Sequence, residues 1–227
     1  MTHPATLLLT RPRAASEQFA EQVLARFGDV KIVISPLLEI VHLPFTDIDT
    51  PDGVIFTSRN GVDAWARAGR LTDVACYCVG QATGNAARHI GFDPFVSGGT
   101  VEHLLNDLIE QAPSGRLLHI RGEFSRGDLS AHLTKAGINT GEVIAYEQRL
   151  LQLSPEAKKL LQGGARVIVP LFSPRTAAHF ASSGPYGPQV DKIAISKAAA
   201  QTCQGARVAP SPDAEGMMSA IADSLSA

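Results

Sequence analysis

Six short polar turns hold the residues of this chain that are best suited to bind a ligand. Each turn follows an apolar run typical of a β-strand and precedes a stretch with helical periodicity. The turns combine small and hydroxyl residues with arginines and one lysine: Thr10-Arg11, Thr57-Ser58-Arg59-Asn60, Gly80-Gln81-Ala82-Thr83, Arg121-Gly122, Ser173-Pro174-Arg175 and Ser196-Lys197. The first N–H groups of a helix have no partner inside the helix, and they attract anions. The turns therefore predict a site for a large polyanion with several carboxylates or phosphates.

A plain helix cap is the alternative explanation for each turn, because Ser, Thr and Gly are common at helix starts for that reason alone. For any single turn we favour the cap. The repetition of one chemistry in six turns favours binding. The candidate binding residues are Arg11, Thr57, Ser58, Asn60, Gly80, Gln81, Thr83, Arg121, Ser173, Ser196 and Lys197.

Tyr146 is the candidate for acid–base chemistry. It lies in an extended segment, residues 141–153, that contains no turn signal. A phenol can donate a hydrogen bond or a proton to a leaving oxygen. A tyrosine packed in a hinge with its hydroxyl in water is the alternative, and position alone slightly favours the packed residue.

The composition and the motifs argue against several classes of protein. A net charge of −2 without a basic block argues against a nucleic-acid binder. The sequence contains no glycine-rich phosphate loop, no G-x-S-x-G turn and no metal-ligand spacing such as H-E-x-x-H. We therefore expect neither a metal nor another cofactor. Cys76 and Cys78 share one face of a strand and His119 lies within a strand, so a buried thiol pair and a structural histidine are the better interpretations.

The N-terminal sequence and the cysteines bear on location. The first residues lack the charged and apolar regions of a signal peptide. The apolar stretches are shorter than the ~18 residues that span a membrane. Three cysteines cannot all pair, and they form no C-x-x-C motif. A reduced, cytoplasmic protein is the simple expectation.

Strand–turn–helix units must position the six turns, and such units repeat along the chain. The expected strands are residues 6–9, 31–35, 54–56, 74–79, 116–120, 141–153, 165–172 and 193–195. Helices follow most of them, and Ser16 is the expected N-cap of the first helix. Repeated strand, polar turn and helix are typical of a parallel α/β fold, in which ligands bind at the carboxyl ends of the strands.

The units fall into look-alike pairs, which indicates an internal duplication. Residues 54–66 resemble 167–181, residues 77–109 resemble 193–225, and residues 7–28 resemble 117–137. The order of these units predicts an α/β protein of two similar parallel-sheet, flavodoxin-like lobes. Residues 38–149 form the continuous lobe, and residues 1–37 plus 150–227 form the discontinuous lobe. Two extended segments, near residues 36–41 and 146–153, are expected to pair as a two-strand hinge.

Seven segments also match the pattern of a known family when they are taken together. They are LLLTRP, DGVIFTSRNGV, VGQATGNAARHIGF, LLHIRG, VIAYEQ, LFSPRTAAHF and SPDAEGMMSAI. Their order and spacing, which cover nearly the whole chain, resemble the uroporphyrinogen-III synthase family. The resemblance implies two α/β lobes, one of them discontinuous, joined by a two-strand ladder. It also implies a cofactor-free carbon–oxygen lyase (a hydro-lyase) of tetrapyrrole and haem biosynthesis.

The resemblance further implies a substrate, a reaction and roles for residues. The substrate is hydroxymethylbilane, a linear tetrapyrrole polycarboxylate, which loses its terminal hydroxyl as water and closes to uroporphyrinogen III with inversion of ring D. Tyr146 matches the tyrosine proposed to assist departure of the hydroxyl. The turns thought to hold the carboxylates match Thr57, Ser58, Gly80, Thr83 and Ser173. The expected protein is a monomer that contacts hydroxymethylbilane synthase transiently and binds neither nucleic acid nor membrane.

One turn departs from the family pattern. Family members carry Gly and Thr in a G-x-x-T-A turn after the last strand, where this chain has Ser196 and Ala199. Because Ser tolerates positive φ less well than Gly, we expect a loop of different shape, in which Lys197 supplies charge in place of lost hydrogen bonds. A non-catalytic bilobed anion-binding protein, or a degenerate synthase-like domain, is the alternative function.

Overall fold

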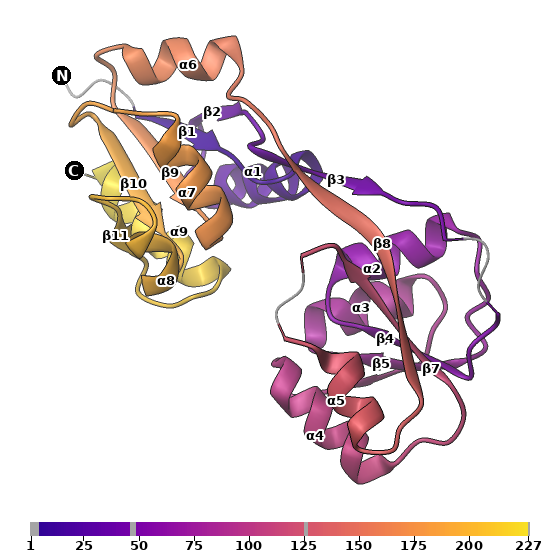
Figure 1. Cartoon of the computed structure of the whole chain (residues 1–227). Coiled ribbons are helices and arrows are strands. Elements are labelled where there is room, and N and C mark those ends of the chain that lie inside the picture. Colours follow the sequence, from indigo (N-terminus) through magenta and orange to yellow (C-terminus); the bar gives the residue numbers. More distant parts are fainter. Residues whose placement is uncertain (1–4, 46–48, 125–126, 227) are drawn as a thin grey trace. The chain divides into compact units, whose positions relative to one another are not determined.

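The computed structural model describes residues 5–45, 49–124 and 127–226. The chain divides into two compact units, each with its own sheet (Figure 1). The terminal unit comprises residues 1–39 and 149–227, and the central unit comprises residues 40–148. The two boundaries fall within strands β3 (Leu38–His42) and β8 (Thr140–Leu150).

The sheet of the terminal unit has five strands in the order β11-β10-β9-β1-β2, and its neighbours pair in parallel. The strands are β1 (Thr6–Leu9), β2 (Lys31–Ile34), β9 (Val167–Leu171), β10 (Val190–Ala194) and β11 (Arg207–Val208). The helices are α1 (Arg13–Phe27), α6 (Pro155–Gln162), α7 (Pro174–Ser182), α8 (Lys197–Gln201) and α9 (Ala214–Ser226).

Helices cover both faces of this sheet. On one face α6, α7 and α8 pack against Leu8, Val169 and Leu171. On the other face α1 and α9 pack against Leu7 and Ile168. Successive residues of a strand point to opposite faces, and both faces are covered here. This explains why Leu7, Leu8 and Leu9 of β1 form an uninterrupted apolar run rather than an alternating one.

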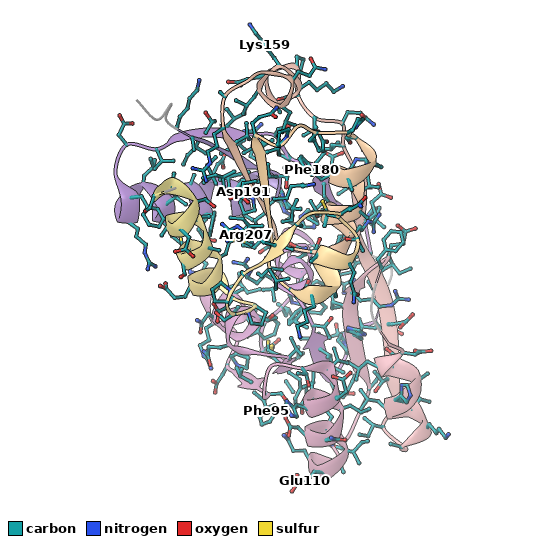
Figure 2. All side chains as sticks on the ribbon, turned by 90° about the vertical axis from the view of Figure 1, so that its left-hand side faces the viewer. Phe95, Glu110, Lys159, Phe180, Asp191 and Arg207 are labelled. Atoms are coloured by element: carbon teal, nitrogen blue, oxygen red, sulfur yellow. The ribbon has the colours of Figure 1, made fainter. Side chains whose placement is uncertain are left out.

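An ionic network fixes α9 to the edge of the terminal sheet. Arg207 of β11 donates from Nε to Asp191 of β10 at 3.2 Å, and the two side chains lie together in Figure 2. Nη2 of Arg207 donates to the Ala220 carbonyl of α9 at 2.5 Å and also to the Ser224 hydroxyl. Hydrogen bonds that involve a charged group are stronger than neutral ones, so this contact holds the last helix in place.

The sheet of the central unit has six strands in the order β3-β8-β7-β4-β5-β6. Besides β3 and β8, its strands are β4 (Gly53–Phe56), β5 (Ala75–Cys78), β6 (Pro94–Val96) and β7 (Leu117–Gly122). The pairs β4–β5, β4–β7, β5–β6 and β7–β8 are parallel. The helices are α2 (Arg59–Arg67), α3 (Gln81–His89), α4 (Val101–Gln111) and α5 (Leu129–Lys135).

The central sheet is also covered on both faces. On one face α2 and α3 enclose a core around Trp65, with Phe56 and Ile120 from the sheet. On the other face α4 and α5 pack against Ile55 and Leu117. The carboxyl ends of the parallel strands in each unit therefore form an edge from which the predicted turns project.

The mixed α/β class with two parallel-dominated sheets is confirmed. The structure adds β6, β11 and α6 to the expected elements. Strands β6 and β11 have three and two residues, too short for a periodic pattern. The start of α6 is visible in the sequence, since Ser154 caps the helix and Pro155 opens it. The expectation that Ser16 caps α1 is wrong: α1 begins at Arg13, and the Ser16 hydroxyl donates to the Arg11 carbonyl at 2.9 Å.

Candidate active site

Two hydroxyl groups meet at the carboxyl edge of the central sheet. Ser58 follows β4 and Tyr146 lies on β8, and their side-chain oxygens are 2.8 Å apart. Tyr146 is 5% exposed and belongs to the core on the α2 side of the sheet. Ser58 occupies the N-cap position of α2 but makes no side-chain bond to that helix. Its hydroxyl is therefore used for Tyr146 rather than for the usual cap.

A β-bulge places Tyr146 on the α2 side. Strand β8 follows β7 in register up to the pair Arg121–Ile144, and Gly122 then pairs with Tyr146, so one residue is skipped. Because side chains alternate between the faces of a strand, the skipped residue moves Tyr146 to the face of Ile120. Gly122 makes room for the ring, since a Cβ there would lie 2.5 Å from Cε2 of Tyr146.

The first turns of α2 and α3 lack side-chain caps. Neither Ser58 nor Gly80, at the two N-cap positions, bonds to its helix through a side chain. In contrast, Thr100 and Asp128 cap α4 and α5. The strands that precede α2 and α3 are neighbours, so both uncapped starts lie at one edge of the sheet. Two adjacent helix N-termini of this kind favour a negatively charged ligand.

The other predicted residues of these two turns differ in exposure. Asn60 is half-buried in the first turn of α2, and Thr83 is buried in the first turn of α3. Gln81 is exposed and donates to the Asn85 side chain at 2.7 Å. Gly80 approaches the next loop closely, because a Cβ on it would lie 3.1 Å from Cα of Gly99. Their binding roles stay predictions.

Thr57 and Arg121 contact side chains of neighbouring strands. Oγ1 of Thr57 lies 3.1 Å from Nε2 of His119. Nη2 of Arg121 lies 2.5 Å from Oε1 of Glu142, and Nη1 donates to the Gly122 carbonyl at 3.0 Å. This pairing raises the pKa of Arg121 and lowers the pKa of Glu142. The guanidinium of Arg121 is thus held within the central unit, and its role in ligand binding stays a prediction.

Ser173 and Ser196 act as helix caps in the terminal unit. Ser173 accepts a hydrogen bond from the Thr176 N–H at 3.1 Å, and Ser196 accepts one from the Ala199 N–H at 3.3 Å. Ser196 has φ −153° and ψ 162°, an extended conformation that any residue adopts. Ser196 therefore adopts its conformation without strain, and the expected difference in loop shape from the family stays a prediction.

Arg11 and Lys197 are the predicted cations of the terminal unit. The Arg11 guanidinium carbon lies 4.2 Å from the centroid of the Phe172 ring, at the adjacent carboxyl ends of β1 and β9. This distance is typical of a cation–π contact. Lys197 is exposed at the first position of the short helix α8. Both residues therefore lie at the strand edge where the turns predicted them.

A hollow of the terminal unit lies elsewhere. Gln152, Lys158, Tyr186 and Gln189 are among its lining residues, which come from α6, its preceding segment and the loop before β10. That loop leads into the amino end of β10, opposite the edge that carries Ser196. We therefore base the site on the polar turns and not on this hollow.

A sequence model of one family, uroporphyrinogen-III synthase HemD, matches residues 17–219. The chain belongs to the uroporphyrinogen-III synthase family. A comparison with curated proteins found no match. Among solved structures, uroporphyrinogen-III synthetase from Helicobacter pylori is similar, with a TM-score of 0.71 and 16% identity over 96% of this chain and 99% of that one. A mutant uroporphyrinogen III synthase from Thermus thermophilus has a TM-score of 0.58 and 16% identity over 98% and 99%.

The family match confirms the resemblance drawn from the seven sequence segments, and the solved structures show the same fold. Members of this family are enzymes of haem biosynthesis that act on a tetrapyrrole. Among the residues that the structure describes, no helix is long and apolar enough to cross a membrane. Over the same residues, no group of three or more His, Cys, Asp or Glu side chains is placed to hold a metal ion.

Two contacts at the candidate site were not predicted from the sequence. His119 was interpreted as structural, and its imidazole also contacts Thr57 in the turn after β4. Gly122 was predicted only as part of the Arg121-Gly122 turn, and its missing side chain accommodates Tyr146. A polar residue between the apolar residues Leu118 and Ile120 of β7 was the available signal for His119. Nothing local in the sequence indicates which side chain faces Gly122.

Proposed function

We propose that the chain is an active uroporphyrinogen-III synthase, a hydro-lyase that converts hydroxymethylbilane to uroporphyrinogen III. The match of the family model over residues 17–219 carries this proposal. The reaction breaks the bond between the terminal methylene carbon and its hydroxyl oxygen, which leaves as water after it gains a proton. The methylene carbon then bonds to the substituted carbon of ring D and gives a spiro intermediate. The bond from that carbon to its original methylene bridge breaks, and the bridge bonds to the free carbon of ring D, which loses its proton. Ring D is thereby inverted, and the product is isomer III.

Tyr146 is the proposed proton donor to the departing hydroxyl. Ser58 supports it: when the serine donates to the phenol oxygen at 2.8 Å, the phenol proton is left to point at the substrate. The same bond stabilises negative charge on the phenol oxygen as its proton leaves. Departure of the hydroxyl needs one donated proton, which this pair is placed to supply.

Positioning of the substrate is the second proposed task. The uncapped starts of α2 and α3 offer backbone N–H groups to carboxylates, and Arg11 and Lys197 offer charge. Ring D must attack through its substituted carbon, and a substrate held in one conformation reacts through one path. Ser173 and Ser196 contribute through the helices that they cap. Asn60, Gln81, Thr83 and Arg121 are kept as proposed contacts of the same substrate.

The two units are proposed to be flavodoxin-like lobes, one discontinuous and one continuous. Strands β3 and β8 are proposed to be the hinge between them. In support, the unit boundaries fall within these two strands, and the strands are neighbours whose segments exchange backbone hydrogen bonds. The Leu43 N–H donates to the Ala145 carbonyl at 2.9 Å, and the Leu151 N–H donates to the Leu37 carbonyl at 3.0 Å. A two-strand connection of this kind allows the lobes to change angle.

A coupled product assay tests the function. Porphobilinogen and a deaminase supply hydroxymethylbilane, the chain is added, and the oxidised porphyrin isomers are separated by chromatography. We expect mainly isomer III with the wild type, and less with Ser58→Ala or Tyr146→Phe. Tyr77→Phe, which removes a hydroxyl from β5 of the same unit, is the matched control and should retain activity. If a folded wild type gives only isomer I, the proposed activity is absent and the non-catalytic alternative gains support.

A further inference from the structure

A row of polar side chains crosses the face of the central sheet that carries α4 and α5. His119 of β7 lies opposite Ile55 of β4 on one side and opposite Glu142 of β8 on the other. Thr57 is two residues beyond Ile55 and therefore shares its face. Nε2 of His119 and Oγ1 of Thr57 are 3.1 Å apart. The histidine thus connects a buried strand to the turn that starts α2.

The imidazole of His119 is neutral near neutral pH. His119 is 3% exposed, and this burial lowers the pKa of the imidazole to about 4. The negative charge of Glu142 opposes the shift, and the positive charge of Arg121 adds to it. A neutral imidazole carries one N–H and one bare nitrogen. The contact with Thr57 therefore has two possible forms: either Nε2–H donates to the hydroxyl, or the hydroxyl donates to a bare Nε2.

The other ring nitrogen distinguishes between these forms. Nδ1 of His119 is buried and has no hydrogen-bond partner among the described residues. If Thr57 donated to Nε2, the ring proton would sit on Nδ1 as a buried N–H without an acceptor. Such groups are rarer in proteins than unpaired acceptors. Arg121, two residues along the same face, likewise has a buried Nε without a partner in the described part of the chain. Its positive charge favours a lone pair on Nδ1 over a second donor.

We propose that His119 is a positioning residue whose Nε2–H donates to Thr57 and thereby directs the Thr57 proton toward the substrate. Thr57 has one proton, and an oxygen that already accepts from His119 is free to donate it at the carboxyl end of β4. The hydroxyl and the open N–H groups at the start of α2 then both offer donors at the carboxyl edge of the central sheet, where a carboxylate can accept from them. The inference rests on the proposed function, in which this turn holds a carboxylate of the tetrapyrrole.

Nitrogen NMR of the full-length, ligand-free chain tests the tautomer. His119→Gln removes one of the seven histidines and so identifies the signals of His119. At neutral pH we expect a protonated-type shift for Nε2 and a bare-type shift for Nδ1. The opposite assignment overturns the inference. This measurement needs no substrate, so its failure is distinct from a failure of the proposed function, which a wild type that makes only isomer I would reveal.

Kinetics of four variants test the route through Thr57. His119→Leu and Thr57→Val should each raise KM about tenfold, with a smaller effect on kcat. Thr57→Val removes the hydrogen bond to the substrate carboxylate, which is made before reaction, and His119→Leu removes the donor that orients the Thr57 hydroxyl for that bond. The double variant should be no worse than Thr57→Val alone. His119→Gln, whose amide can donate from the place of Nε2, should keep a KM near that of the wild type. Additive effects, or a loss with His119→Leu in kcat alone, would contradict a role through Thr57.

Thermal unfolding of every variant accompanies the kinetics. If His119→Leu does not fold, His119→Asn replaces it, because the shorter amide does not reach Thr57 and remains polar. A KM for His119→Asn equal to that of His119→Gln would also overturn the inference. If His119 is only structural, His119→Gln and His119→Asn should lose stability and activity in parallel, and the loss should be the same whether or not Thr57 is present.

Discussion

Replacing Gly122 by alanine should displace Tyr146 without altering either hydroxyl of the Ser58–Tyr146 pair. A Cβ on Gly122 would lie 2.5 Å from Cε2 and 2.7 Å from Cζ of the ring. Carbon atoms that are not bonded rest about 3.5–4.0 Å apart, so the ring must retreat by roughly 1 Å. Such a shift removes the phenol from its place beside Ser58, where the two oxygens now lie 2.8 Å apart.

The size of the effect follows from overpacking. Extra carbon in a well-packed core costs about 1–3 kcal/mol. For a chain of this length each kcal/mol lowers the unfolding temperature by about 2–4 °C. We therefore expect a moderately less stable Gly122→Ala protein whose yield of isomer III falls as far as that of Ser58→Ala. Thermal unfolding and the coupled product assay measure the two quantities on the same sample.

Two further variants make the Gly122 prediction refutable. Gly164→Ala is the matched control, since a Cβ there has open space around it and the residue has no positive φ. Its stability should be unchanged or slightly raised, by less than about 1 kcal/mol. Gly122→Ala combined with Tyr146→Leu removes the colliding ring atoms and should recover stability but not activity. A Gly122→Ala protein with the unfolding temperature and product yield of the wild type would refute the reasoning.

The remaining predictions concern pH, the last helix and the thiols. The pKa of His119 is about 4 in the folded chain, below its ordinary value of 6.5. Between about pH 6.5 and pH 4 the unfolded chain therefore binds a proton on His119 that the folded chain does not. As the pH is lowered through this range, the free energy of unfolding should decrease, by up to about 3 kcal/mol near pH 4. His119→Gln should lack this component, which urea unfolding at about pH 7 and about pH 4 measures; parallel losses in both proteins would contradict it. Arg207→Met should cost about 1–3 kcal/mol, because α9 loses its ionic network and Asp191 its partner. Denaturant unfolding should show no comparable loss for Arg13→Met, which breaks only an exposed pair. All three cysteines are buried, so a thiol reagent should label them only on unfolding, and rapid labelling of the folded chain would show that they are accessible.

Local pattern was sufficient for much of the fold. The leucine run at residues 7–9 predicted a strand, and the structure covers β1 on both faces, with alternate leucines in different cores. The serines after β9 and β10 were placed at helix starts by their type and position, and both are caps in the structure. These features depend on residues that are close in sequence, where periodicity and capping rules apply.

Periodicity and capping rules could not predict which side chains contact one another within the site. Ser58 and Tyr146 are 88 positions apart, and Thr57 and His119 are 62 apart. Contacts of that range depend on strand order and register, which periodicity does not specify. The short edge strands β6 and β11 also take their conformation from the strands beside them rather than from their own residues.

The bulge between β7 and β8 makes the chemistry of this chain depend on a count of residues as well as on their identity. Up to Ile144 the strand keeps step with its neighbour, and beyond it Tyr146 is out of phase by one position. Deleting the skipped Ala145 would restore the regular alternation and leave the phenol opposite Gly122, on the side of Ser58. Inserting one residue after Ala145, with the bulge kept at one residue, would instead put the phenol on the opposite side of the sheet, away from Ser58. An insertion-and-deletion scan should thus find that insertions between Ile144 and Tyr146 abolish the production of isomer III, whereas deletion of Ala145 is better tolerated.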